Sequence, residues 1–136
     1  MSRDRQPMDF SRIDFQSAQN LASIMQPNPG GHRLIHIQQS DNMAPEIPAG
    51  AIVIVDTSIT WWVKDAFYLV NLPGKVGTAF PPSQQVLKII QPGPSIGHEH
   101  ERWIAYPNPN YDNYWAPLEA LDIAGLVIGS IRCHQH

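Results

Sequence analysis

Residues 37–56 of the chain read IQQSDNMAPEIPAGAIVIVD and carry the clearest fold signal in the sequence. Within this stretch, Ala51–Val55 is apolar and mostly β-branched, and it is bounded by Gly50 and Asp56. Such a short, uninterrupted run is typical of a strand that is buried on both faces. The polar, proline-containing residues before it predict a loop, and loops held by rigid strands are where functional sites usually lie.

Five further segments show strand signals, because each is apolar and is followed or flanked by turn residues. These segments are residues 34–37, 66–70, 86–90, 103–106 and 123–131. The 13 prolines and 9 glycines argue against a helical bundle, since proline interrupts helices and central strands alike. The sequence therefore predicts a mostly β domain of short strands joined by irregular loops.

The first 31 residues have a different pattern, in which apolar side chains recur at helical spacing. These side chains are Phe10, Ile13, Ala18, Leu21, Ile24 and Met25. The sequence Pro27–Gly31 ends any helix that forms. We predict a short helical arm and linker over residues 1–31, followed by one domain over residues 32–136. The arm either covers an edge of its own domain or docks onto a partner.

Composition narrows the functional classes. A chain of 136 residues with 43% hydrophobic residues can bury one core, and its net charge of -3 provides no basic surface for direct nucleic-acid binding. Cys133 is the single cysteine, which rules out an internal disulfide and indicates a reducing compartment. No apolar run approaches the ~20 residues that span a bilayer, so we expect a cytoplasmic protein without membrane association.

Lys88 stands out because it lies in the middle of a predicted strand, between Leu87 and Ile89. An ammonium group is costly to bury without a partner. A lysine in this position is either an edge residue that extends its charged end to solvent or part of a functional site.

Four segments resemble, in the same order, the Ser–Lys self-cleaving peptidase domain of LexA, UmuD and the lambdoid phage repressors. The first is Ser40–Pro45 with the following Gly50 turn, which is similar to the nucleophile motif G-[DN]-S-M-x-P and includes Asp41, Met43 and Pro45. The second, Val86–Ile90, is similar to the strand with the general-base lysine. The third, Pro107–Tyr111, is similar to an N-P-x-Y loop, and the fourth, Ile123–Gly129, is similar to the closing strand. The resemblance covers residues 34–132 and implies a LexA-like β-fold.

In that family a serine hydroxyl attacks a peptide bond of its own chain, and a desolvated lysine accepts the proton. Lys88 matches the base, but Asn42 stands at the nucleophile position and Ser40 replaces the preceding glycine. A carboxamide is a poor nucleophile, and its oxygen could instead accept a hydrogen bond from the Lys88 ammonium. The Ala-Gly or Cys-Gly bond that the family cleaves is also missing before Ser40. We therefore expect no catalysis.

The resemblance implies a homodimer that acts as a regulatory interaction module, in a transcriptional control system of a phage or mobile element. Mixed assemblies with a repressor or another LexA-like protein are expected partners. The apolar run 123–131 lacks alternation, so we expect an exposed edge strand that pairs with a second copy through Leu126, Val127 and Ile128. Two alternatives stay open: an active peptidase that uses Ser40 with Lys88, and an oligomerisation fragment of a repressor.

Two other groups of residues could bind zinc by residue type alone. His98 and His100 lie in a loop bounded by Gly and Pro, and the run Cys133–His136 ends the chain. Neither group has the context of a structural site, so we expect no metal and no cofactor. The pair Trp61-Trp62 and the aromatic cluster Tyr111–Trp115 are interpreted as packing residues.

Overall fold

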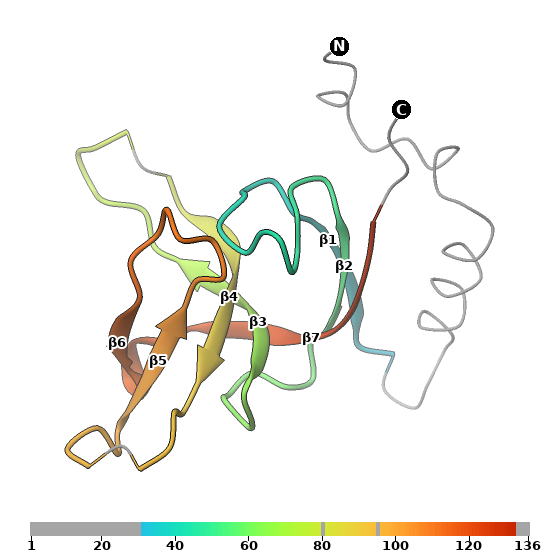
Figure 1. Ribbon diagram of the computed structural model, residues 1–136. Coiled ribbons are helices and arrows are strands. Elements are labelled where there is room, and N and C mark those ends of the chain that lie inside the picture. The colour runs from blue at the N-terminus through green and yellow to red at the C-terminus, as the bar shows by residue number, and fades with distance from the viewer. Residues whose placement is uncertain (1–30, 80, 95, 133–136) are drawn as a thin grey trace, which may run out of the picture.

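The computed structural model describes residues 31–79, 81–94 and 96–132, which form a single antiparallel sheet of seven strands (Figure 1). The mostly β prediction is confirmed. The strands are β1 (Arg33–Ile37), β2 (Ile52–Asp56), β3 (Ala66–Leu72), β4 (Ser83–Ile90), β5 (Glu101–Ala105), β6 (Tyr114–Pro117) and β7 (Ile123–Ile131). A 3-10 turn, η3 (Leu118–Ala120), connects the last two strands. The helical arm predicted for residues 1–31 lies, apart from Gly31, outside the described residues.

The last strand of the chain lies in the middle of the sheet. The strand order is β1-β2-β7-β3-β4-β5-β6, so β7 joins the N-terminal pair of strands to the rest of the fold (Figure 1). The expectation that residues 123–131 form an exposed edge is therefore wrong. The β7 backbone is paired on both sides, with β2 and with β3, and Ile123, Leu126 and Ile131 are buried within the chain, whereas Ile128 is exposed. In the described part of the chain, β1 and β6 are the edge strands.

Most predicted strands lie close to the expected positions, with two differences. β6 was not predicted, because a four-residue strand that ends in Pro117 has too little alternation to be distinguished from a loop. β4 begins at Ser83, three residues before the apolar run, because its polar start pairs with the end of β3 in a long hairpin.

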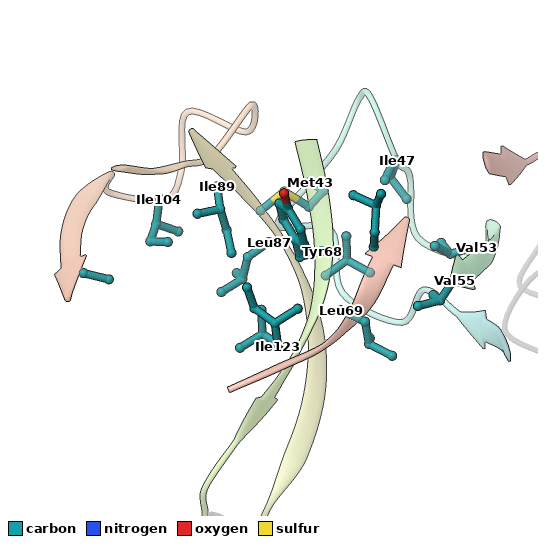
Figure 2. Packing of buried hydrophobic residues seen from close by; sticks show 14 of the residues in the cluster. Met43, Ile47, Val53, Val55, Tyr68, Leu69, Leu87, Ile89, Ile104 and Ile123 are labelled. Carbon is teal, nitrogen blue, oxygen red and sulfur yellow. The ribbon is translucent and has the colours of Figure 1, made fainter. Parts of the chain in front are cut away.

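The core forms around the centre of the sheet and also includes residues from the loop 38–51. Tyr68, Leu69, Leu87 and Ile89 of β3 and β4 are almost completely buried. Met43, from the loop, is fully buried and belongs to the same core cluster as Tyr68 (Figure 2). The loop that contains the motif Ser40–Pro45 is therefore anchored from within by apolar packing.

The strands β2 and β7 approach closely where the register shifts. A Cβ atom at Gly125 would lie 2.3 Å from Cγ1 of Val55 and 2.8 Å from the carbonyl oxygen of Asp56. The pairing of β2 with β7 shifts between Ile54 and Val55, which is the mark of a bulge. Glycine at position 125 is thus required by the close approach of the two backbones.

Candidate functional site

The turn Ser40-Asp41-Asn42 is held by the side chain of Asn42, which is only 2% exposed. The Asn42 carboxamide oxygen accepts a hydrogen bond from Nε2 of Gln38 at 3.0 Å, and its Nδ2 donates to the carbonyl oxygen of Val86 at 3.3 Å. The backbone N–H of Asn42 donates to Oγ of Ser40 at 3.1 Å. The residue at the expected nucleophile position is therefore a buried structural carboxamide that connects the turn to β4.

The N-P-x-Y segment contacts the same turn from a distant part of the sequence. Asn108 Nδ2 donates to the carbonyl oxygen of Asp41 at 2.9 Å, and the Tyr111 hydroxyl donates to Oδ1 of Asp41 at 2.7 Å. Tyr111 stacks on Tyr106, whose pKa is raised to about 12 by burial and by neighbouring tyrosines. Two of the four segments that carry the family resemblance thus meet at Asp41.

The other residues of the motif have structural contacts. Met43 packs in the core. The carbonyl oxygen of Pro45 accepts a hydrogen bond from Nη2 of Arg132 at 2.9 Å. Gly50 has a φ of 90°, a left-handed conformation that favours glycine, and its N–H donates to the carbonyl oxygen of Gln38 at 2.7 Å.

Lys88 does not contact Asn42. Its Nζ lies 3.2 Å from Oε1 of Glu46, and it also lies 5.5 Å from the centre of the Phe67 ring. The expected hydrogen bond from the Lys88 ammonium to the Asn42 oxygen is therefore not formed, because Glu46 offers a full negative charge and Gln38 already occupies the Asn42 oxygen. The Lys88 side chain is 32% exposed, so it reaches solvent from a strand whose neighbouring residues are buried.

A groove of about 760 Å³ lies beside Asn42. Its walls are the end of β1 with the turn that follows, the end of β3, and the start of β4. Six of the twelve lining residues carry a carboxamide side chain, namely Gln38, Gln39, Asn42, Asn71, Gln84 and Gln85. Each carboxamide can both donate and accept hydrogen bonds, as a peptide unit does. The groove therefore has the chemistry to bind uncharged polar groups such as the backbone of an extended peptide.

Sequence reasoning missed the half of this groove that belongs to the β3–β4 hairpin. Asn71 and Gln84 are paired across the hairpin, with Gln84 Nε2 donating to Oδ1 of Asn71 at 2.9 Å. The adjacent glutamine pairs 38–39 and 84–85 are visible in the sequence as polar interruptions beside strands. Nothing in a one-dimensional pattern, however, shows that these two pairs line the same groove.

Ser40 also lines the groove, so the hydrolase alternative has a candidate hydroxyl there. Lys88 is absent from the groove lining, and the single titratable side chain in that lining is His36. Burial lowers the pKa of His36, which keeps the imidazole neutral near pH 7 and able to act as a base. Within the groove lining, His36 is therefore the side chain that could take the place of Lys88 as a base.

The remaining candidate residues lie apart from the groove. His98 bonds to Glu101 and stacks on Trp115, with the ring centres 4.0 Å apart. Among the described residues no cluster of three or more His, Cys, Asp or Glu side chains could hold a metal ion, and Cys133–His136 lies outside them. Trp61 is 58% exposed, whereas Nε1 of its neighbour Trp62 donates to the carbonyl oxygen of Ile89.

The three proposed dimer residues on β7 have different environments. Leu126 is buried in the core, Val127 packs against the core and is partly buried, and Ile128 is 39% exposed. Ile128 alone among them presents a large apolar surface to solvent.

Two comparisons with known proteins give no relatives: neither protein-family models nor curated proteins match this chain. Within the part of the chain that the structure describes, no helix has the length and apolar character to cross a membrane.

Proposed function

We propose that the chain is a catalytically inactive LexA-like domain that acts as a regulatory protein-interaction module. The observation that carries the proposal is the environment of Asn42. The turn keeps its contacts with the N-P-x-Y segment, while the nucleophile position holds a carboxamide that is buried and satisfied by Gln38 and Val86. Lys88 forms an ion pair with Glu46, which leaves no Ser–Lys pair at this turn.

The proposed interaction site is the amide-lined groove. A cleft without an active nucleophile can retain peptide binding, because binding needs matched donors and acceptors and not an attacking group. The lining carries no carboxylate, ammonium or guanidinium group. We therefore propose that it holds an extended, uncharged segment of a partner protein, such as a repressor or another LexA-like protein of a phage or mobile element in the cytoplasm.

A peptide-display selection tests the groove directly. The wild-type protein is expected to enrich peptides that the double variant Gln84→Ala/Gln85→Ala no longer binds. Gln91→Ala is the matched control. Gln91 is an exposed glutamine that directly follows β4, and it does not line the groove. Equal binding by the wild type and the double variant would exclude the groove as the peptide site.

The module is also proposed to be a homodimer, with Ile128 as a surface contact. Sedimentation at tens of micromolar should give about twice the chain mass of 15.2 kDa, and Ile128→Lys should return the protein to a monomer. A wild-type mass that stays at 15.2 kDa under these conditions would exclude the dimer.

The hydrolase alternative was a Ser40 nucleophile that acts with Lys88. Ser40 lines the groove and Lys88 does not, so His36, the titratable side chain of that lining, is tested as the base as well. An active serine would react with a fluorophosphonate, and the label would disappear in Ser40→Ala and weaken in His36→Gln. Absence of labelling in the wild type would remove this alternative.

A further inference from the structure

The strands β1, β2 and β7 carry a second apolar face, on the side opposite the core residues Val53 and Val55. In antiparallel pairs, directly opposite residues point to the same side of the sheet. The register places Ile35 opposite Ile54, Ile37 opposite Ile52, and Ile52 opposite Ile131. We call these five residues the isoleucine face: Ile35, Ile37, Ile52, Ile54 and Ile131.

The centre of the isoleucine face is buried, although it lies outside the main core, whereas Ile35 at the β1 edge is 38% exposed and Ile37 is partly buried. Ile52 and Ile54 are 0% exposed and Ile131 is 6% exposed, and none of the three belongs to the core cluster that contains Val53 and Val55. A side chain on an uncovered sheet surface keeps contact with water. The complete burial of Ile52 and Ile54 therefore requires a second layer over this face.

We propose that the chain's own segment Phe10–Met25 forms this layer. Its apolar side chains recur at helical spacing, so one side of the segment matches an apolar surface. A helix of this length would measure about 24 Å. The five-residue strands β1 and β2 are about 17 Å long, so the segment is long enough to cross the face.

The connection to β1 also fits this placement. Seven residues separate Met25 from Arg33, and an extended chain of that length reaches up to about 23 Å. Gly31 has a φ of 56°, a conformation that allows the chain to turn before it enters β1. The segment thus returns over the strand that directly follows it.

This inference is independent of the proposed function and assigns the N-terminal arm a definite role. The arm is an integral layer of the domain, and a partner could use the isoleucine face only by displacing it. A second copy of the chain is the competing occupant.

Methyl NMR on the intact chain tests the placement. Nuclear Overhauser effects are expected between the δ1 methyls of Ile52 and Ile54 and the methyls of Leu21 and Met25, within one molecule. A sample that mixes labelled and unlabelled chains separates the two occupants. Nuclear Overhauser effects from Ile52 and Ile54 that arise only between different molecules would overturn the proposal. So would effects that connect these two residues only to segments other than Phe10–Met25.

Charge substitutions give an independent readout by hydrogen exchange. Leu21→Asp/Ile24→Asp should increase amide exchange of residues 52–55 by about tenfold or more, because two buried aliphatic side chains lose their apolar contact. The control Gln19→Asp/Ser23→Asp adds the same charge on the opposite side of the helical pattern and should leave exchange unchanged. The proposal would be overturned if amide exchange of residues 52–55 did not increase in Leu21→Asp/Ile24→Asp. It would also be overturned if exchange increased equally in this variant and in the control.

Discussion

Replacing Asn42 with alanine should destabilise the domain, because its side chain joins the turn to β4. The substitution removes the hydrogen bonds to Gln38 and to the carbonyl oxygen of Val86, at 3.0 and 3.3 Å. Nε2 of Gln38 keeps its bond to the carbonyl oxygen of Ser40, whereas the Val86 carbonyl loses its side-chain partner.

The magnitude follows from these contacts. Each hydrogen bond contributes about 1 kcal/mol net, and a buried polar group left without its partner costs about 1–3 kcal/mol. Part of that cost is relieved at Gln38, which retains one acceptor. We therefore expect the free energy of unfolding to fall by about 2–3 kcal/mol in Asn42→Ala.

Urea denaturation with tryptophan fluorescence measures this change, provided that the slope of the transition is the same for both proteins. Gln39→Ala is the matched control, since Gln39 lines the groove but is exposed, and its effect should stay within about 0.5 kcal/mol. Asn42→Ala and Gln38→Ala should be non-additive, because they remove a shared bond. A loss in Asn42→Ala no larger than in Gln39→Ala would refute the structural role of the carboxamide.

Three further predictions concern other parts of the fold. Gly125→Ala should lower the free energy of unfolding by about 1–3 kcal/mol in urea denaturation, because the added Cβ would collide with β2. The control Ser130→Ala, on the exposed part of β7, should have little effect. An equal loss of unfolding free energy in the two variants would contradict the close approach of β2 and β7 at Gly125. Lys88→Met should change thermal stability by less than about 1 kcal/mol, because its ion pair with Glu46 is partly exposed, and a loss of several kcal/mol would show a deeper role. Burial lowers the pKa of His36 in the fold, so the unfolded chain binds the proton more readily, and stability should fall as pH drops below the ordinary value of 6.5. His36→Gln should reduce that fall between pH 7.5 and 5.5 in urea titrations, and an unchanged pH dependence would contradict the assignment.

The strand positions could be predicted because apolar runs report burial directly. Ala51–Val55 lacks alternation and is buried on both faces, whereas residues 123–131 are buried mainly in their first half and leave Ile128 and Ser130 exposed. The same pattern cannot say whether the cover is another strand of the chain or another molecule. The prediction of an edge strand at β7 was wrong for that reason, since the sheet order depends on pairing between distant segments.

The candidate site was predictable in its position but not in its contacts. The motif order pointed to the turn at Asn42 and to the segment that contains Tyr111, which meet at Asp41. The partner of Lys88 was not predictable, because the path of the loop places Glu46 beside Lys88, whereas Asn42 bonds to Val86 on the same strand. The groove was missed because the residues that line it come from segments that are far apart in the sequence, residues 36–42, 71–72 and 82–86.

Intact-mass spectrometry after incubation at alkaline pH with a fluorophosphonate tests the central claim, the absence of a working nucleophile, most directly. With Asn42 in the nucleophile position and Lys88 paired with Glu46, the protein should keep its full, unlabelled mass of 15.2 kDa. A label on Ser40, or a specific cleavage product that disappears in Ser40→Ala, would contradict the account.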